Sequence, residues 1–213
     1  MAGSIKQALA RGVCALTGWT VIPRGAIPDK CVVIGYPHTT NWDFALVILA
    51  SMFYGKRLNW LGKVELFSWG MGPVMRRLGG IAVTRNAAHG KVDEVTAAFD
   101  QSRELRIVVP PEGTRKHTPH WKIGFYRIAY AANVPLHLAR FDYVKRTIDF
   151  GEPMFLTGDV PADMDRIRAA YEGCRGLYDE QQGPVALKDE ARLTPIIAAL
   201  RRRGSGLAKG PSA

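Results

Sequence analysis

The chain has 213 residues, with 29 Lys and Arg against 19 Asp and Glu, which gives a formal net charge of +10. This length suits one domain with a sizeable core. The positive charge favours partners that carry negative charge, such as an anionic membrane surface or a nucleic acid. A nucleic-acid role is disfavoured because the part expected to fold has no arginine-rich block, zinc spacing or ribonucleoprotein aromatic signature.

The N-terminal segment, residues 1–22, is amphipathic. Its large apolar residues recur at helical spacing, at Ile5, Leu9, Val13 and Leu16. This pattern predicts a helix with one apolar side, which either packs on the core or lies on a membrane surface. Arg11 interrupts the apolar run and no cleavage site follows, so we expect no signal peptide here.

Residues 23–203 are expected to form a single α/β domain with a largely parallel central sheet flanked by helices, because strand-like and helix-like apolar runs alternate. The predicted strands are Val32–Gly35, Asn59–Gly62, Ile81–Val83, Ile107–Val109, Pro135–Ala139 and Thr147–Glu152. The predicted helices are Trp42–Tyr54, Trp69–Leu78, Lys91–Gln101, Phe125–Ala132 and Pro161–Glu180. Residues 204–213 have the composition of a disordered tail.

The run Pro37-His38-Thr39-Thr40-Asn41-Trp42-Asp43 places an imidazole near a carboxylate in the sequence. In one continuous helix, His38 and Asp43 would lie about 140° apart, on different faces. If His38 instead follows a strand and Thr40 or Asn41 caps the next helix, Asp43 lies in the first turn and can face the ring. The carboxylate would then fix the tautomer, leaving the other ring nitrogen to take a proton from an attacking hydroxyl. The alternative is that both residues only cap a helix.

A second run, Pro111-Glu112-Gly113-Thr114-Arg115, also follows an apolar strand. Because His38 and this run both follow predicted parallel strands, both should lie at the carboxyl ends of strands, where open α/β sheets form ligand crevices. The alternative is a surface turn closed by a salt bridge between Glu112 and Arg115.

Together the two runs resemble the His-x4-Asp and Glu-Gly-Thr-Arg boxes of the glycerolipid acyltransferase family (PlsC-like), typified by lysophosphatidate acyltransferases. Further runs are similar to other blocks of this family and occur in the same order: Gly79-Gly80-Ile81-Ala82-Val83-Thr84-Arg85, Trp121-Lys122-Ile123-Gly124-Phe125 and Val134-Pro135-Leu136. The resemblance covers roughly residues 30–140. The chain departs from the family at Pro37, where Asn is usual, and at Ala82, where an aromatic is common. These departures leave the acceptor open.

The resemblance implies an O-acyltransferase that moves a fatty acyl group from acyl-CoA or acyl carrier protein to a hydroxyl of a lysophospholipid or a glycerol-phosphate-like acceptor. It implies that His38 is the general base and that Asp43 orients it. The implied substrate-binding residues are Glu112, Gly113, Thr114, Arg115, Arg85, Lys63 and Lys122. Among them Glu112 would help to position the acceptor, while Arg115 and Arg85 would hold its phosphate. Backbone N–H groups around Gly113 are candidates for the oxyanion.

We expect no metal and no cofactor; the acyl thioester, acyl-CoA or acyl carrier protein, is a co-substrate. The three cysteines, Cys14, Cys31 and Cys174, are widely spaced, and His117 and His120 lack carboxylate or thiolate partners in the sequence. No apolar run reaches the roughly 18 to 20 residues that cross a bilayer. The expected location is therefore cytoplasmic, peripheral on the inner face of the membrane.

Two other functions fit parts of the sequence. The first is a thioester hydrolase in which the same His and Asp activate water. The second is a catalytically silent protein that binds a membrane or a lipid. An ordinary serine esterase is disfavoured because no Gly-x-Ser-x-Gly run is present.

Overall fold

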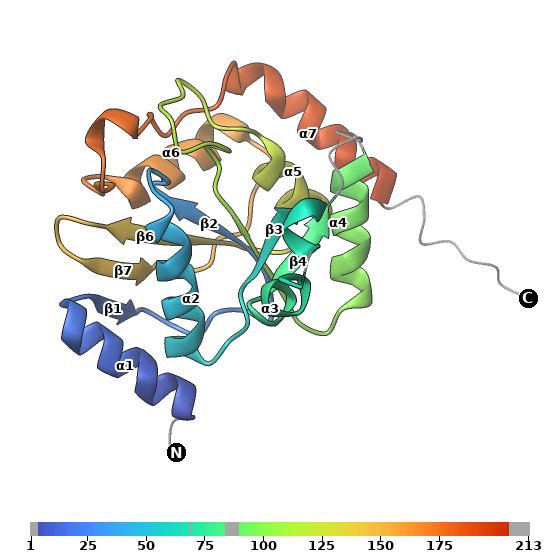
Figure 1. Cartoon of the computed structure of the whole chain (residues 1–213). Coiled ribbons are helices and arrows are strands. Elements are labelled where there is room, and N and C mark those ends of the chain that lie inside the picture. The colour runs from blue at the N-terminus through green and yellow to red at the C-terminus, as the bar shows by residue number, and fades with distance from the viewer. Residues whose placement is uncertain (1–3, 69, 84–89, 205–213) are drawn as a thin grey trace, which may run out of the picture.

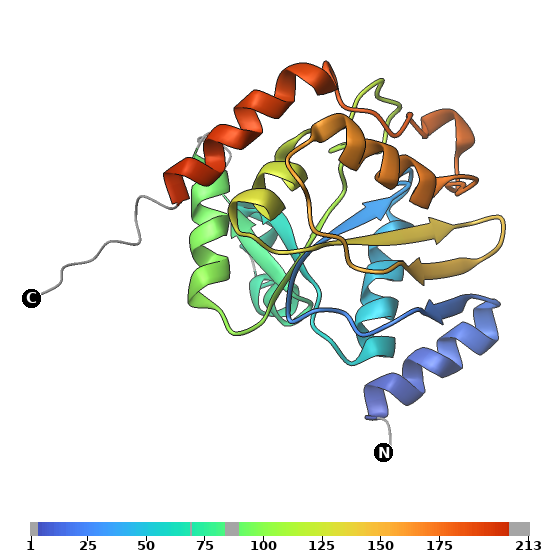
Figure 2. The same cartoon turned by 180° about the vertical axis from the view of Figure 1, so that it is seen from behind.

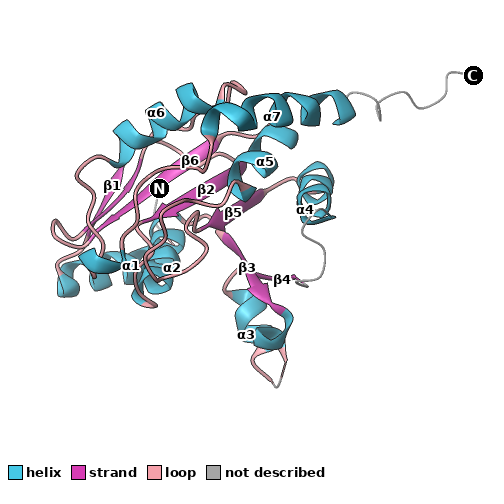
Figure 3. Ribbon diagram, turned by 90° about the horizontal axis from the view of Figure 1, so that it is seen from above, coloured by secondary structure: helices cyan, strands magenta, loops and turns pink. Residues whose placement is uncertain are grey.

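The computed structural model describes residues 4–68, 70–83 and 90–204. A seven-stranded sheet lies between two layers of helices, as Figure 1 and Figure 3 show. The strands are β1 (Thr20–Pro23), β2 (Lys30–Tyr36), β3 (Asn59–Lys63), β4 (Gly80–Val83), β5 (Leu105–Val109), β6 (Leu136–Asp142) and β7 (Thr147–Phe150). The α-helices are α1 (Ile5–Thr17), α2 (Trp42–Tyr54), α3 (Gly72–Arg77), α4 (Gly90–Gln101), α5 (Gly124–Ala131), α6 (Val160–Tyr171) and α7 (Glu190–Gly204). The 3-10 helices are η1 (Val64–Phe67) and η2 (Asp179–Gln181).

The strand order is β1-β7-β6-β2-β5-β3-β4. The strands β6, β2, β5, β3 and β4 are parallel to one another. The strand β7 pairs antiparallel with β6, and β1 pairs parallel with β7. The predicted fold class, a largely parallel sheet flanked by helices in an α/β domain, is therefore confirmed. The carboxyl ends of the five parallel strands lie along one edge of the sheet.

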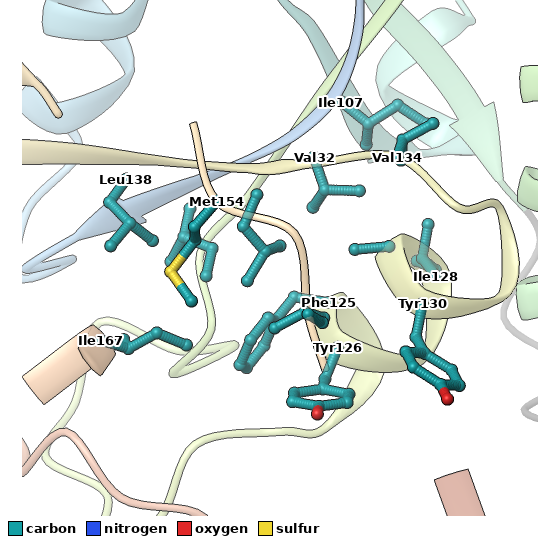
Figure 4. Packing of buried hydrophobic residues seen from close by; sticks show 14 of the residues in the cluster. Val32, Ile107, Phe125, Tyr126, Ile128, Tyr130, Val134, Leu138, Met154 and Ile167 are labelled. Atoms are coloured by element: carbon teal, nitrogen blue, oxygen red, sulfur yellow. The ribbon is translucent and has the colours of Figure 1, made fainter. Parts of the chain in front are cut away.

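The central strand β2 is buried on both of its faces. Val32 and Ile34 point into the core layer that contains α5, whereas Cys31 and Val33 point into the layer that contains α2. A strand buried on both faces needs a continuous apolar run rather than alternation, and this explains the run seen in the sequence. Figure 4 shows Val32 facing Phe125 and other side chains of α5.

Two layers of helices cover the sheet. The helices α1 and α2 pack on one face, and α3 lies on the same side, beyond β3 (Figure 3). The helices α5, α6 and α7 cover the other face, with α4 beside α5 (Figure 2). The larger apolar core lies on this second side and contains aromatic side chains from α5 and α6.

The N-terminal helix α1 packs on the core through one side only. Ala10 and Cys14 are buried against α2. The apolar residues that predict the helix lie elsewhere on its surface and are exposed: Ile5, Leu9, Val13 and Leu16. The helix thus has a small packed side and a separate apolar side that faces solvent. In the part of the chain that the structure describes, no helix combines the length and the apolar character needed to cross a bilayer.

Some predicted elements differ from the structure. The predicted helix Pro161–Glu180 is too long, because α6 ends at Tyr171 and Gly173 follows with a positive φ of 67°. The strand β1 at the edge of the sheet was not predicted. The predicted helix Trp69–Leu78 is shorter, spanning Gly72–Arg77, and Trp69 lies outside the described residues. Of the predicted tail, Gly204 is the last residue of α7, and 205–213 lie outside the described residues.

Candidate active site

The two sequence boxes meet at the carboxyl edge of the sheet. Ile34 of β2 pairs with Val109 of β5, so the loops that follow these strands leave the sheet side by side. The backbone N–H of His38, in the loop after β2, donates a hydrogen bond to Glu112 Oε2 at 2.8 Å, in the loop after β5. Sequence positions that are 74 residues apart thus form one site.

His38 and Asp43 lie in hydrogen-bonding contact. The ring Nδ1 of His38 is 3.0 Å from Asp43 Oδ2. Asp43 lies in the first turn of α2, as its spacing from His38 predicts. The side chain of His38 is 23% exposed and that of Asp43 is 4% exposed. Because the carboxylate accepts, a neutral ring carries its proton on Nδ1, which leaves Nε2 free to accept a proton.

Of the two residues predicted to cap α2, Thr40 does so: its Oγ1 accepts the N–H of Trp42, the first residue of the helix, at 3.3 Å. Asn41 is the N-cap residue, but its side chain makes no capping bond and instead accepts one from Arg115 Nη1. The carboxylate of Asp43 accepts the N–H groups of Thr39 and Thr40 at 2.9 Å and 3.0 Å. These bonds turn Asp43 back towards the loop that carries His38 and fix its orientation.

Tyr143 completes the surroundings of Asp43 and was not found from the sequence. Its hydroxyl donates to Asp43 Oδ1 at 2.6 Å. Burial, followed by the hydrogen bond to Asp43, raises the pKa of Tyr143 above its usual value. The two residues are 100 positions apart in the chain, so no local pattern connects them.

Glu112 is buried, being only 1% exposed. Besides the His38 N–H, its carboxylate accepts the N–H of Gly183 at 3.4 Å. Burial raises the pKa of Glu112 to about 7, against the opposing effect of these two hydrogen bonds. Both carboxylate oxygens therefore contact the main chain of the protein itself, and Glu112 joins the loop after β2 to the loop before α7.

Gly113 and Lys122 lie against each other. Gly113 has a positive φ of 66°, and a Cβ there would lie 2.8 Å from the Lys122 Cδ, Cε and Nζ atoms. The Gly113 N–H donates to the Pro110 carbonyl at 3.1 Å, so this group is occupied within the turn. The Lys122 N–H donates to the Pro111 carbonyl at 2.8 Å. The positively charged side chain of Lys122 is thereby held beside the second box.

The remaining predicted site residues lie around the two boxes. The Thr114 Oγ1 accepts the N–H of Lys116 at 3.2 Å. Lys63 is exposed at the end of β3, on the same sheet edge. Among the described residues, Lys63 has no hydrogen bond or ion pair with either box. Arg85 lies outside the described residues.

The cysteines of the chain are buried free thiols. Burial raises the pKa of Cys31 to about 12 and that of Cys174 to about 11. Both thiols are therefore protonated near neutral pH, where the nucleophilic form is the thiolate. Within the described ranges, no group of three His, Cys, Asp or Glu residues is placed to hold a metal ion.

Comparison with known proteins identifies a family and a similar fold. A family model described as Acyltransferase matches residues 17–138, which contain both boxes. One solved structure is the 1-acyl-sn-glycerophosphate (LPA) acyltransferase PlsC from Thermotoga maritima. It aligns with a TM-score of 0.50 over 98% of this chain and 80% of that chain, at 16% identity. A search of curated proteins gives no significant match. At this identity, the structural likeness bears on the fold.

Proposed function

Because the chain belongs to the acyltransferase family, we propose that it transfers a fatty acyl group from a thioester to a hydroxyl of a glycerolipid acceptor. The donor is acyl-CoA or acyl carrier protein, and the acceptor is a lysophospholipid or a glycerol-phosphate-like molecule. The observation that carries this proposal is the contact between His38 Nδ1 and Asp43 Oδ2 at the edge of the sheet. It supplies an oriented base whose second nitrogen is free.

In the proposed reaction, Nε2 of His38 takes the proton of the acceptor hydroxyl as its oxygen attacks the thioester carbonyl. The carbon–oxygen bond forms, and the tetrahedral intermediate then collapses with loss of the thiolate. The imidazolium returns the proton to that sulfur and releases a free thiol. Asp43 holds the Nδ1 proton and stabilises the imidazolium. No side-chain nucleophile is needed, which suits a chain whose cysteines are buried.

We propose that cations beside the two boxes hold the phosphate of the acceptor. Arg115 is exposed and contacts Asn41, two residues before Asp43. Lys122 lies over Gly113 and is also exposed. A guanidinium and an ammonium at these positions can donate charge-assisted hydrogen bonds to phosphate oxygens. Lys63 and Arg85 are further candidates on sequence grounds. We assign Glu112 the task of fixing the main chain of His38, because its carboxylate accepts that N–H.

We propose that the protein works at the cytoplasmic face of a membrane, where lipid acceptors are found. The exposed apolar side of α1 supports this placement, with Ile5 at 89% and Leu16 at 90% exposure. The start of α2 adds Trp42, which is 68% exposed and adjacent to Asp43 in the sequence. Lys6 and Arg11 give α1 positive charge. Apolar side chains combined with basic ones favour an anionic lipid surface.

The test is mass spectrometric detection of acylated product from purified wild type and from His38→Ala. The donors are long-chain acyl-CoA and acyl carrier protein, and the acceptors are lysophosphatidate, glycerol phosphate and lyso-aminolipids. We expect a product that requires an acceptor and a fall of about a thousandfold in His38→Ala, within the range for loss of a general base. His117→Ala is the matched control, because His117 is exposed outside both boxes and should retain activity.

Three results would contradict the proposal. Acyl transfer at the wild-type rate by a folded His38→Ala variant would exclude His38 as the general base. Release of free fatty acid without acceptor would identify a hydrolase. Absence of any product across the panel, with lipid binding retained, would favour the silent binding protein. Sedimentation with vesicles tests the membrane placement, for which we expect binding to anionic vesicles and no binding after Leu9→Glu with Leu16→Glu.

A further inference from the structure

We infer that Tyr143 is a positioning residue for the proposed base, holding Asp43 in the orientation in which it orients His38. This inference rests on the proposed function, because it assigns Tyr143 a task only if His38 acts as the base. Tyr143 lies beyond residues 17–138, the range that the family model matches. Its assignment therefore comes from the geometry of this chain.

The hydrogen bonds of Asp43 divide between its two oxygens. Oδ2 receives the ring of His38 and the N–H groups of Thr39 and Thr40. Oδ1 receives the hydroxyl of Tyr143 at 2.6 Å. All the bonds to Oδ2 come from one short loop, whereas the bond to Oδ1 comes from the far side, after β6. Tyr143 therefore prevents the carboxylate from rotating about its Cβ–Cγ bond.

Tyr143 is itself held in place. Its N–H donates to the Arg175 carbonyl at 2.9 Å, and its ring packs edge-on against Trp19, with centroids 5.1 Å apart. The turn that follows is closed by Asp142, which accepts the N–H groups of Val144 and Lys145. A residue fixed by main chain and by ring packing loses little entropy when its hydroxyl donates to Asp43.

The hydroxyl of Tyr143 remains a hydrogen-bond donor throughout the neutral pH range in which His38 would act as the base. Burial and the bond to Asp43 both raise its pKa, so the hydroxyl keeps its proton in the neutral range. Among the described residues, the other titratable groups that act on this pair are His38, Glu112 and Tyr178. Since Tyr143 stays protonated, it does not exchange a proton with the other groups. It influences the reaction through the orientation of the Asp43 carboxylate and through how much of the carboxylate charge acts on His38.

The loss of the hydroxyl has a predictable direction. With Oδ1 left without the tyrosine, more of the carboxylate charge is available to the ring of His38, which favours the imidazolium. A higher pH is then needed to free Nε2. The carboxylate also gains rotational freedom, so fewer molecules hold the ring in the productive orientation. Binding of the acceptor should not change, because Tyr143 acts through Asp43.

Elsewhere the structure contains a matched pair. The hydroxyl of Tyr126 donates to Asp163 Oδ2, also at 2.6 Å, in the core between α5 and α6. Asp163 is completely buried, and no histidine is bonded to it among the described residues. Removal of this hydroxyl tests what a tyrosine–aspartate bond does for stability alone.

The experiment compares Tyr143→Phe, Tyr126→Phe and His38→Ala with wild type by steady-state kinetics across pH and by thermal unfolding. For Tyr143→Phe we expect kcat to fall about ten- to a hundredfold, as loss of one hydrogen bond to a charged group predicts. We expect the acidic limb of the kcat/KM profile to move to higher pH, with the acceptor KM unchanged. Tyr126→Phe should lower the unfolding temperature and leave kcat and the acidic limb unchanged.

The outcomes separate this inference from the proposed function. If His38→Ala is silent and Tyr143→Phe has wild-type kcat and pH profile, the inference is wrong and the proposed function stands. A fall in kcat without a shift of the acidic limb, matched by Tyr126→Phe, would show a structural role only and overturn it too. If His38→Ala transfers normally, the proposed function itself fails.

A second variant, Trp19→Leu, should also move the acidic limb of the kcat/KM profile to higher pH, but by a smaller amount than Tyr143→Phe, because it loosens the packing of the Tyr143 ring.

Discussion

Asp43 and Asp163 are two buried carboxylates that begin two different helices in nearly the same way. Asp43 lies in the first turn of α2 and Asp163 in the first turn of α6. Each accepts a tyrosine hydroxyl at 2.6 Å, from Tyr143 and Tyr126 respectively. Each also accepts main-chain N–H groups from the residues just before its helix. Burial and saturation with donors are thus common to both.

The two sites differ in the remaining partner. Asp43 contacts the ring of His38, whose side chain is 23% exposed, whereas Asp163 contacts Arg166 Nη1 at 3.5 Å. An imidazole can take up and release a proton near neutral pH, and a guanidinium cannot. Asp43 also lies at the carboxyl edge of the parallel strands, where ligand sites form. A buried carboxylate held by a tyrosine and by main-chain N–H groups can therefore be purely structural. Its remaining partner and its position on the sheet distinguish a candidate catalytic aspartate from a structural one.

The largest effect should come from replacing each carboxylate by its amide. Asp43→Asn should lower kcat/KM about a thousandfold, because an amide nitrogen cannot accept the Nδ1 proton and favours the wrong tautomer. Asp163→Asn should retain activity and lose about 1 to 3 kcal/mol of stability, since buried donors lose their acceptor. Steady-state kinetics and urea unfolding measure the two effects. Equal losses of activity in both variants would show that the comparison is wrong.

The next effect concerns Glu112, which joins the loops around His38 and has no counterpart at Asp163. Its pKa in the folded protein is raised from 4.5 to about 7. The stability that protonated Glu112 contributes is fully present below pH 4.5, the pKa of this group in the unfolded chain, and is lost as pH rises through about 7, its pKa in the folded protein. Glu112→Gln does not titrate there. The unfolding free energy of wild type should therefore fall relative to the variant between these pH values, by up to about 3 kcal/mol.

Urea unfolding at several pH values measures this difference. Glu94→Gln is the control, because Glu94 is exposed on α4 and makes no ion pair with the other described residues. The wild-type and Glu112→Gln curves should diverge with rising pH, while those of wild type and Glu94→Gln should run parallel. Parallel curves for Glu112→Gln as well would show that burial of this carboxyl has no such cost.

The smallest effect should come from the arginines near the two carboxylates. Arg115→Ala should raise the KM for a phosphate-bearing acceptor about tenfold with little change in kcat, as expected for loss of one charge-assisted hydrogen bond. Arg166→Ala should leave this KM unchanged, because Arg166 contacts Asp163 instead. Kinetics with a phosphate-bearing and a phosphate-free acceptor provide the measurement. An equal change for both acceptors would remove Arg115 from phosphate binding.

The sequence predicted more of the sheet than of its surroundings. The continuous apolar run of β2 and the alternation of elements were sufficient for the α/β fold, because burial on both faces leaves a direct trace in composition. The predicted helix Pro161–Glu180 failed because the run from Glu172 onward bends back after Gly173, whose conformation has no helical counterpart. The residues after this bend supply donors to the Thr39 hydroxyl, which no local periodicity indicates.

The sequence by itself determined the chemistry that the chain can offer. It placed His38 and Asp43 at a spacing that suits a loop followed by a helix, and it placed Glu112 after a neighbouring strand. Only the tertiary structure decided how these groups are held. The Tyr143 hydroxyl on Asp43 and the Gly183 N–H on Glu112 arrive from loops 100 and 71 residues away. Such contacts depend on the register and crossing of whole elements, and a hydrogen bond between distant loops leaves no periodic trace in the sequence of either one.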